Sequence, residues 1–277
     1  EFDWVDRVSI ELTTRMLATI FDFPFAERRK LTYWSDLSIG SPETTGMDEG
    51  PAVEEVQAGL TDMANTFMGL WQERASGDPS DRNDLITMLA HGETTRDMIS
   101  RPLEFLGNIM LLIVGGNDTT RNSISGGVLA LNQFPDEYAK LRSDHSLIPN
   151  MVSEIVRWQT PVLHMRRTLL SDYEIGGKQM KAGDKVVLWY ISANRDESMH
   201  PNADQLIIDR PDARKHASFG FGIHRCMGNR LAEMQLRTLW EEIMKRFDRI
   251  EVTGPERRLK SNFIRGILEL PVRLHRA

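Results

Sequence analysis

The sequence predicts a mainly α-helical protein with a minor β-sheet region. Apolar residues recur at helical spacing over most of the chain, whereas residues 166–189 fall into short segments separated by turn residues such as Gly176 and Gly177. A third observation is the apolar run 103–114 within the longest helical pattern, which is typical of a helix buried on nearly every face. The 277 residues are enough to bury a large core.

In the N-terminal half, prolines and turn residues divide the helical pattern. The first helix is expected to end before Pro24, which suits the first turn of the next one, and Asp81 is expected to cap a short helix. Residues 39–50, rich in Gly, Ser, Thr and Pro, are expected to form a loop. The helices predicted here span residues 4–23, 24–37, 51–75 and 81–89, followed by a long helix that begins at Thr95 or Met98 and ends at Gln133.

In the C-terminal half, helices give way to short strands and return after the cysteine. Glycine pairs and Gly-Asp turns separate the strands, as in β-hairpins. Helices are predicted at residues 135–142, 147–159 and 229–247, strands at 166–170, 173–175, 178–180, 185–189, 250–252 and 267–274, and irregular structure at 199–216.

Composition excludes several classes of function. The net charge of −6 argues against general nucleic-acid binding. The longest apolar run, 109–114, is far too short to span a bilayer, so no membrane anchor is expected. Cys226 is the only cysteine, which excludes an internal disulfide and agrees with a cytoplasmic location.

The densest cluster of unusual residues surrounds Cys226. Gly220, Gly222 and Gly228 lie close to it on both sides, and such glycines allow tight turns and the close approach of a bulky group. The helical pattern from Asn229 places the sulfur at or just before a helix N-terminus, where thiolate is favoured over thiol. Such a thiolate is a metal ligand or a nucleophile, and the alternative is a buried cysteine that acts as a small apolar residue.

A second unusual stretch, residues 115–120, reads Gly-Gly-Asn-Asp-Thr-Thr and follows the apolar run directly. Two glycines inside a helix cost about 1 kcal/mol each relative to Ala, and an Asp beyond an apolar run costs more unless a partner satisfies it. Residues that destabilise a helix or a core at such positions indicate a functional site. The alternative is a helix kink at a glycine pair, with the Asp in a role like that of an N-cap.

A third motif consists of Glu154 and Arg157, which are three residues apart and share one face of a helix. Taken alone, this is the pattern of a surface ion pair that contributes little to stability. Its position between the glycine pair and the cysteine loop gives it more weight.

In this order along the chain, the three motifs resemble those of the cytochromes P450, the haem-thiolate monooxygenases. Phe219, Gly222, Cys226 and Gly228, with His224 two residues before the cysteine, match the haem-binding loop of that family. The resemblance implies one cytochrome P450 domain over residues 1–277, which comprises about the C-terminal two-thirds of the family fold. The N-terminal part of that fold is expected to be missing from this chain.

The resemblance assigns roles to the first two motifs. Cys226 is expected to be the axial ligand of haem iron. Gly115 and Gly116 are expected to let haem and O2 lie against the backbone. Asp118 and Thr119 are expected to relay protons for oxygen activation, with Thr120 as the neighbouring alternative to Thr119.

Further haem contacts follow from the same resemblance. Arg167 resembles the arginine that pairs with a haem propionate, with Arg166 as the competing choice, and His224 is expected to contact the other propionate. The remaining cofactor-binding residues expected in the cysteine loop are Phe219, Gly220, Gly222 and Gly228.

The resemblance also implies a structural network and a substrate pocket. In the family, the Glu154–Arg157 pair and a later arginine lock the region behind the haem, and Arg210 is the candidate for that arginine. The positions expected to face substrate are all apolar, which implies a hydrophobic substrate, although core packing explains each of them equally well. They are Leu111, Leu112, Val162, Leu163, Met165, Phe263 and Ile264.

Several stretches are similar to one group within the family, the soluble bacterial alkane hydroxylases, in residues 115–123, 154–161, 164–168 and 219–226. This similarity implies heme b and the terminal hydroxylation of medium-chain alkanes or fatty acids, with electrons from NAD(P)H through a ferredoxin reductase and a ferredoxin. An acidic ferredoxin is expected to dock near Arg225, Arg230 and Arg237.

Three alternatives stay open. The chain can belong to a terpene hydroxylase or another fatty-acid hydroxylase of the same superfamily, or it can be a non-catalytic haem-binding fragment. A hydrolase built on Cys226 and His224 is the third, and it leaves Asp118 and Thr119 unexplained.

Overall fold

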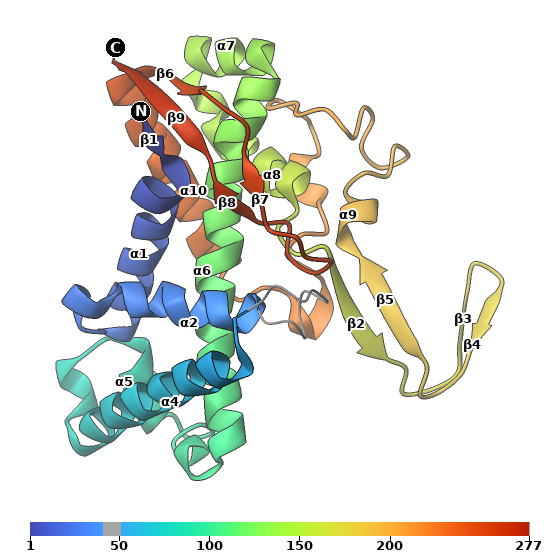
Figure 1. Cartoon of the computed structure of the whole chain (residues 1–277). Helices are drawn as coiled ribbons and strands as arrows, with labels where there is room; N and C mark the ends of the chain where they lie inside the picture. Colours follow the sequence, from blue (N-terminus) through green and yellow to red (C-terminus); the bar gives the residue numbers. More distant parts are fainter. Residues whose placement is uncertain (41–50, 277) are drawn as a thin grey trace. The chain divides into compact units, whose positions relative to one another are not determined.

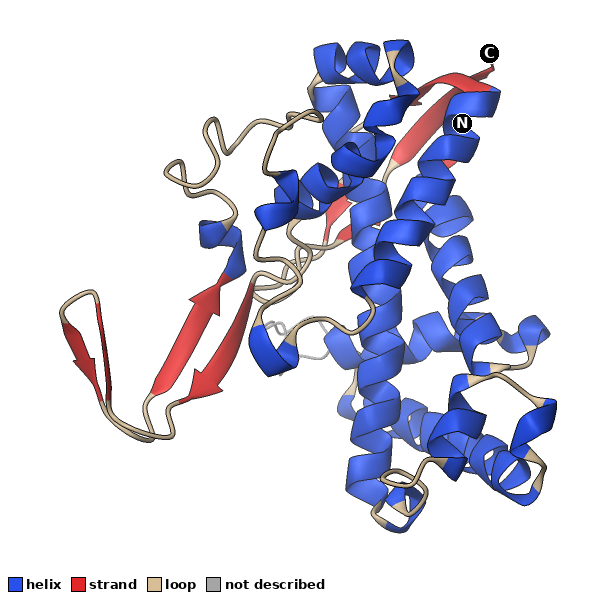
Figure 2. Cartoon of the chain, turned by 180° about the vertical axis from the view of Figure 1, so that it is seen from behind, coloured by secondary structure: helices blue, strands red, loops and turns tan. Residues whose placement is uncertain are grey.

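The computed structural model describes residues 1–40 and 51–276. Within these residues helices dominate and the strands form small sheets of two or three strands (Figure 2), which confirms the predicted fold class. Two compact units share the long helix α6 (Pro102–Gln133), which divides between Ser125 and Gly126 (Figure 1).

The first unit contains residues 1–125, 254–261 and 266–272. Its helices pack aromatic side chains together: Phe21 meets Phe67 edge-on at 5.3 Å, and Trp71 meets Phe105 edge-on at 5.4 Å. Besides the first part of α6, its helices are η1 (Val5–Ile10, a π-helix), α1 (Glu11–Phe21), η2 (Phe25–Glu27), α2 (Arg29–Ile39), α4 (Val53–Ser76), η3 (Pro79–Asp81), α5 (Leu85–His91) and η4 (Met98–Ser100).

Short strands complete the first unit. β7 (Arg257–Arg258) pairs with β8 (Ile267–Glu269), and β1 (Phe2–Asp3) pairs with the first residues of β9 (Pro271–Arg276). The register of this second pair places Phe2 opposite Val272.

The second unit contains the remaining described residues, including the second part of α6. Its helices are α7 (Pro135–Ser143), η5 (His145–Leu147), α8 (Ile148–Gln159), α9 (Tyr190–Ala193), η6 (Ala213–Lys215), η7 (Gly222–His224) and α10 (Asn229–Arg246). Its strands are β2 (His164–Thr168), β3 (Tyr173–Ile175), β4 (Lys178–Met180), β5 (Lys185–Trp189) and β6 (Phe247–Val252).

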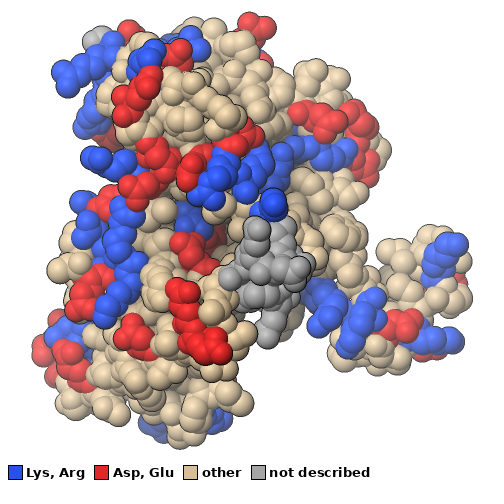
Figure 3. All heavy atoms as spheres, in the orientation of Figure 1, with Lys and Arg blue, Asp and Glu red and all other residues tan. Residues whose placement is uncertain are grey.

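The strands of the second unit form hairpin-like pairs. β2 pairs with β5, with His164 opposite Trp189. β3 pairs with β4 across Gly176 and Gly177, which both have positive φ, as a tight hairpin turn requires. On the face drawn in Figure 3, acidic and basic side chains are interspersed, in keeping with the small net charge of −6.

The structure corrects several predicted boundaries. Asp81 lies at the end of a 3-10 turn and does not cap α5; Asp84 does, because its carboxylate accepts a hydrogen bond from the Thr87 backbone at 2.9 Å. The long helix begins only at Pro102, since proline favours the first helical turn. The predicted strand 267–274 is two strands, interrupted at Leu270. The predicted loop 39–50 falls almost entirely outside the described residues.

Candidate functional site

The cysteine loop of the second unit connects η7 to α10. Gly220 and Gly222 have φ angles of +64° and +70°, which L-residues with a side chain rarely adopt. The Cys226 backbone N–H donates to the Phe219 carbonyl oxygen at 2.8 Å and closes the loop on itself. The sulfur therefore lies three residues before the first residue of α10, as the sequence predicts.

The sulfur is exposed and has hydrogen-bond donors beside it. Partial burial by the loop raises the pKa of the Cys226 thiol, while the backbone N–H groups of Gly228 and Asn229 and the charge of Arg225 act in the opposite direction. N–H donors directed at a sulfur stabilise a metal-bound thiolate and tune its electron donation. The net shift is upward because burial outweighs the N–H donors, which corrects the expectation that the loop by itself favours thiolate over thiol. A metal bound to the sulfur would supply the positive charge that stabilises the thiolate.

Large apolar side chains are exposed around this sulfur. Phe221, Ile223 and Met227 are 67%, 96% and 83% exposed. An apolar surface of this kind marks a place where an apolar partner binds. The open space over Gly222, where an added Cβ would meet nothing within 4 Å, lets a flat group approach the backbone.

A second part of the unit is a buried ionic network on α8. Glu154 and Arg157 are both fully buried, and Arg157 donates from Nε and Nη2 to the Glu154 carboxylate at 2.7 and 2.8 Å. Arg210 donates from Nε to the same carboxylate at 3.1 Å. The structure therefore brings together the three residues that the sequence analysis grouped.

The two guanidinium groups also hold the irregular backbone that precedes the cysteine loop. Arg157 Nη1 donates to the carbonyl oxygens of Asn194 and Ala203 at 2.6 and 2.8 Å. Arg210 Nη1 donates to that of Pro201 at 2.6 Å. A stretch without regular structure thus has a fixed path, because charged donors satisfy its carbonyl groups.

Asn194 links this network to the cysteine loop, and sequence reasoning missed it. Its buried side chain donates to Thr160 and Ser218 at 2.8 Å each and accepts from the Ala217 backbone at 2.7 Å. Ser218 in turn donates to the Val156 carbonyl oxygen at 2.8 Å. The signal available in the sequence was an amide residue directly after an apolar stretch, which needs buried partners.

The two candidate arginines on β2 differ in exposure. Arg166 is exposed and Arg167 is half-buried, as alternation along a strand requires. Within residues 1–40 and 51–276, no carboxylate pairs with Arg167, whose Nη1 donates to the Arg166 carbonyl oxygen at 2.9 Å. His224 is exposed at the end of η7. Arg167 and His224 are therefore available to an anionic group.

Five of the seven predicted substrate residues lie on two adjacent segments of the second unit. Val162 forms a bridge with Ile264, and the Leu163 N–H donates to the Phe263 carbonyl oxygen at 2.9 Å. Ile264 is buried, so it contributes to packing. Val162, Leu163 and Met165 are half-buried. The other two residues, Leu111 and Leu112, lie on α6 in the first unit, where Leu112 packs against the core and Leu111 is exposed.

The glycine pair lies within a helix that continues without a break. An added Cβ at Gly115 would meet nothing within 4 Å, whereas one at Gly116 would lie 2.7 Å from Leu17 Cδ2 on α1. Gly116 therefore serves the packing of α6 against α1, and only Gly115 leaves open space of the predicted kind. Asp118 lies inside this helix and does not act as an N-cap, which removes that part of the alternative.

Asp118 and Thr119 are in different environments although they are neighbours. Thr119 is half-buried and donates from Oγ1 to the Gly115 carbonyl oxygen at 2.8 Å, while Thr120 is buried. Asp118 is buried and accepts hydrogen bonds from Ser35 on α2 and from Arg121. Burial raises the pKa of the Asp118 carboxyl, and the charge of Arg121 opposes that shift.

The side chains around Cys226 fit a metal cofactor in which most of the metal ligands belong to the cofactor itself. In the part of the chain that the structure describes, no group of three or more His, Cys, Asp or Glu side chains could hold a metal ion. A single cysteine, an apolar surface and an unpaired arginine match a haem, in which the macrocycle supplies four nitrogens and carboxylates. None of the described helices is long and apolar enough to cross a membrane.

Comparison with known proteins agrees with this assignment. Residues 50–274 match the sequence profile of the cytochrome P450 family. Linalool 8-monooxygenase of Pseudomonas putida is 38% identical, over 98% of this chain and 65% of its own length. Methyl-branched lipid omega-hydroxylase of Mycobacterium tuberculosis is 35% identical, over 98% of this chain and 62% of its own length.

Solved structures give the same result. Cytochrome P450-153 from Novosphingobium aromaticivorans superposes with a TM-score of 0.86 at 50% identity, over 99% of this chain and 65% of that one. The chain thus spans about two-thirds or less of the length of these relatives. The profile match, the shared fold and the cysteine loop lead to one conclusion: the chain belongs to the cytochrome P450 family.

Proposed function

We propose that the protein containing this chain is a haem-thiolate monooxygenase that hydroxylates an unactivated C–H bond of a hydrophobic substrate. The observation that carries the proposal is Cys226, exposed in a glycine-rich loop with backbone N–H groups beside its sulfur. When bound, the haem supplies the activation of O2 that no side chain can perform.

The residues of the second unit hold the cofactor in this proposal. Cys226 binds the iron, and Arg167 and His224 bind the propionates. Glu154, Arg157 and Arg210 do not touch the haem but fix the backbone that leads into the cysteine loop. Asn194 connects their network to that loop. Their role is structural.

The residues of α6 supply protons in this proposal. Burial raises the pKa of the Asp118 carboxyl, which favours proton uptake there, and Thr119 has a hydroxyl that both donates and accepts hydrogen bonds. Thr120 is buried, which supports Thr119 as the hydroxyl of the pair.

The substrate class follows from apolar side chains and from the relatives. We propose the terminal carbon of medium-chain alkanes or fatty acids, supported by the motif similarity to alkane hydroxylases and by the methyl-branched lipid omega-hydroxylase. A terpene substrate is the second candidate, supported by the similarity to linalool 8-monooxygenase.

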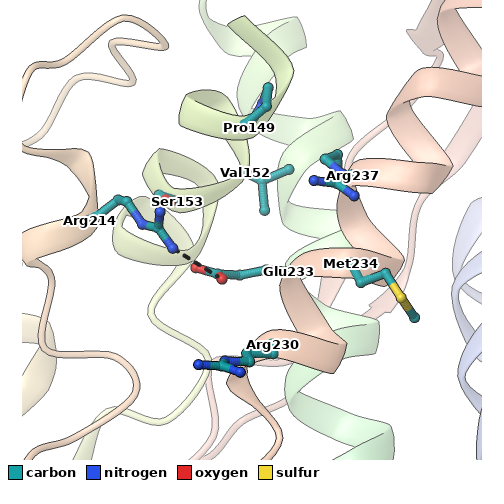
Figure 4. Close-up of a pocket in the computed structure, with 8 residues that line it drawn as sticks. All are labelled: Pro149, Val152, Ser153, Arg214, Arg230, Glu233, Met234 and Arg237. Carbon is teal, nitrogen blue, oxygen red and sulfur yellow. Dashed lines mark ion pairs between the residues drawn. The ribbon is translucent and has the colours of Figure 1, made fainter.

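Electrons are proposed to come from NAD(P)H through a ferredoxin reductase and a ferredoxin. Arg214, Arg230 and Arg237 line a cavity of about 360 Å³ between α8, η6 and α10 (Figure 4). Two acids neutralise part of this charge: Glu233 pairs with Arg214 at 3.6 Å and Glu241 pairs with Arg237 at 3.5 Å, which leaves a net positive charge from Arg230. A basic surface of this kind suits an acidic protein, because charge complementarity accelerates docking.

The test uses the full-length protein with a ferredoxin system and NADH. Octane, dodecanoic acid and linalool are supplied in turn, and products are identified by mass spectrometry. A terminal alcohol from octane or dodecanoic acid supports the first candidate. Conversion of linalool alone favours the second, and no oxygenated product from any substrate contradicts both.

The docking face is tested separately with Arg237→Glu, and with Lys245→Glu, further along α10, as the matched control. The first change is expected to slow ferredoxin association several-fold at low salt, and the control much less. Equal rates for the two variants would contradict this docking face.

A further inference from the structure

We propose that Asp36, on α2, is a positioning residue that keeps a proton on Asp118 by competing with it for Arg121. The proposal rests on the proposed function, in which Asp118 supplies protons. It adds two residues, Asp36 and Arg121, that none of the three sequence motifs includes.

The geometry places one guanidinium between two carboxylates. Arg121 Nη2 donates to Asp36 Oδ1 at 2.9 Å and to Asp118 Oδ1. All three residues belong to the first unit. Both contacts use the same nitrogen atom, so the two carboxylates lie within about 5 Å of each other, where like charges repel strongly.

Charge balance then decides which acid holds a proton. Two ionised carboxylates and one guanidinium leave one negative charge that no partner neutralises. Asp118 is 1% exposed, whereas the Asp36 side chain is 52% exposed and water stabilises its charge. Protonation of Asp118 is therefore the cheaper way to remove the excess charge.

Three elements lie next to Asp118: its own helix α6, α2 and α1. Burial is the main cause that raises the pKa of Asp118; the charge of Arg121 on α6 lowers this pKa, and the charge of Asp36 on α2 raises it further. The third neighbour, α1, contributes uncharged groups: Thr13 donates to Asn117 at 2.7 Å, and Leu17 faces Gly116. Among the described residues, the charges that act on Asp118 thus come from two side chains, Arg121 and Asp36.

The same arrangement allows the proton to be lost and regained. When Asp118 gives up its proton, its new charge is neutralised by Arg121, while the charge of Asp36 remains solvated. The Ser35 hydroxyl, bonded to the other oxygen of Asp118, can donate to the carboxylate or accept from the carboxyl. Asp118 can then take up a proton again, so each cycle returns the network to its starting charge.

The test measures protonation and not turnover. Infrared spectra of the full-length protein are titrated with pH, and the carboxyl C=O stretch of Asp118 is assigned by its loss in Asp118→Asn. We expect Asp36→Asn to lower the titration midpoint of this band by about one pH unit, because Arg121 then forms an ion pair with Asp118 only. Asp36→Glu, which keeps the charge, is expected to restore most of the midpoint.

Asp62→Asn is the matched control. Asp62 is an exposed acid on α4, and its carboxylate accepts a hydrogen bond at 3.2 Å from Trp34, which lies on α2 like Asp36. It is expected to leave the midpoint unchanged. A midpoint that Asp36→Asn does not move, or a shift of equal size in Asp62→Asn, would overturn the proposal. A full-length protein without monooxygenase activity would refute the proposed function, yet this titration would still decide the role of Asp36.

Discussion

The buried network of Glu154, Arg157 and Arg210 makes the sharpest prediction about stability. Arg157→Ala removes five hydrogen bonds, two to the Glu154 carboxylate and three to the carbonyl oxygens of residues 194, 203 and 205. Both Glu154 and Arg157 have no exposed side-chain surface, so water does not replace these contacts without rearrangement.

The magnitude follows from two contributions. Breaking a buried ion pair by removing one partner costs about 3–5 kcal/mol. Each buried carbonyl oxygen that loses its donor adds about 1 kcal/mol or more. Arg210 still holds Glu154 and reduces the first contribution. We therefore predict that Arg157→Ala lowers the free energy of unfolding by at least about 4 kcal/mol.

The assay is urea denaturation of the full-length protein, followed by circular dichroism. Arg157→Lys keeps the charge but not the planar fork, and we expect it to recover less than half of the loss. The control is Lys181→Ala, which breaks an exposed pair with Asp172 and is expected to cost under about 1 kcal/mol. A loss in Arg157→Ala as small as that of the control would refute the reasoning.

Three further predictions concern local packing, pH and capping. Gly116→Ala is expected to destabilise the protein by about 1–3 kcal/mol, because its Cβ would lie 2.7 Å from a core leucine of α1. Gly115→Ala has open space and should stabilise the protein by up to about 1 kcal/mol. Thermal denaturation of the two variants shows whether the two effects have opposite signs. Burial lowers the pKa of His216 to about 4 in the folded protein. As the pH falls, the imidazole therefore becomes protonated in the unfolded chain before it does so in the folded protein. Up to about 3 kcal/mol of stability is lost between pH 6.5 and pH 4. His216→Gln should flatten this dependence in urea titrations at both pH values, and an unchanged slope would contradict it. Asp84→Ala should cost about 1 kcal/mol or more and Asp81→Ala almost nothing in the same assay, and equal losses would contradict the assignment of the cap.

Features that depend on local sequence were predictable. Helical periodicity placed Cys226 just before α10, and strand alternation distinguished Arg166 from Arg167. The spacing of Glu154 and Arg157 put them on one helix face. Each of these follows from the geometry of a single element, so residues a few positions apart contain the whole signal.

Features that depend on distant partners were not predictable. Ser35 bonds to Asp118 across 83 residues of sequence, and no periodicity relates the two. The role of Asn194 could not be predicted for the same reason, because its hydrogen-bond partners lie in other segments before and after it in the sequence. The contact of Gly116 with Leu17 on another helix could not be predicted either, because no sequence pattern relates the two residues. The prediction of Asp81 as the cap is wrong because α5 begins only at Leu85, and the extended backbone at Asp84 brings the Asp84 carboxylate to the Thr87 N–H.

The most direct test of the central proposal is the carbon monoxide difference spectrum of the full-length protein after reduction with dithionite. We expect a strongly red-shifted Soret band for the native protein, because its iron is held by the Cys226 thiolate. Cys226→Ser is expected to abolish the red shift while the circular dichroism spectrum stays the same. A folded, complete protein without this band, or a serine variant that keeps it, would contradict the assignment of Cys226 as the iron ligand.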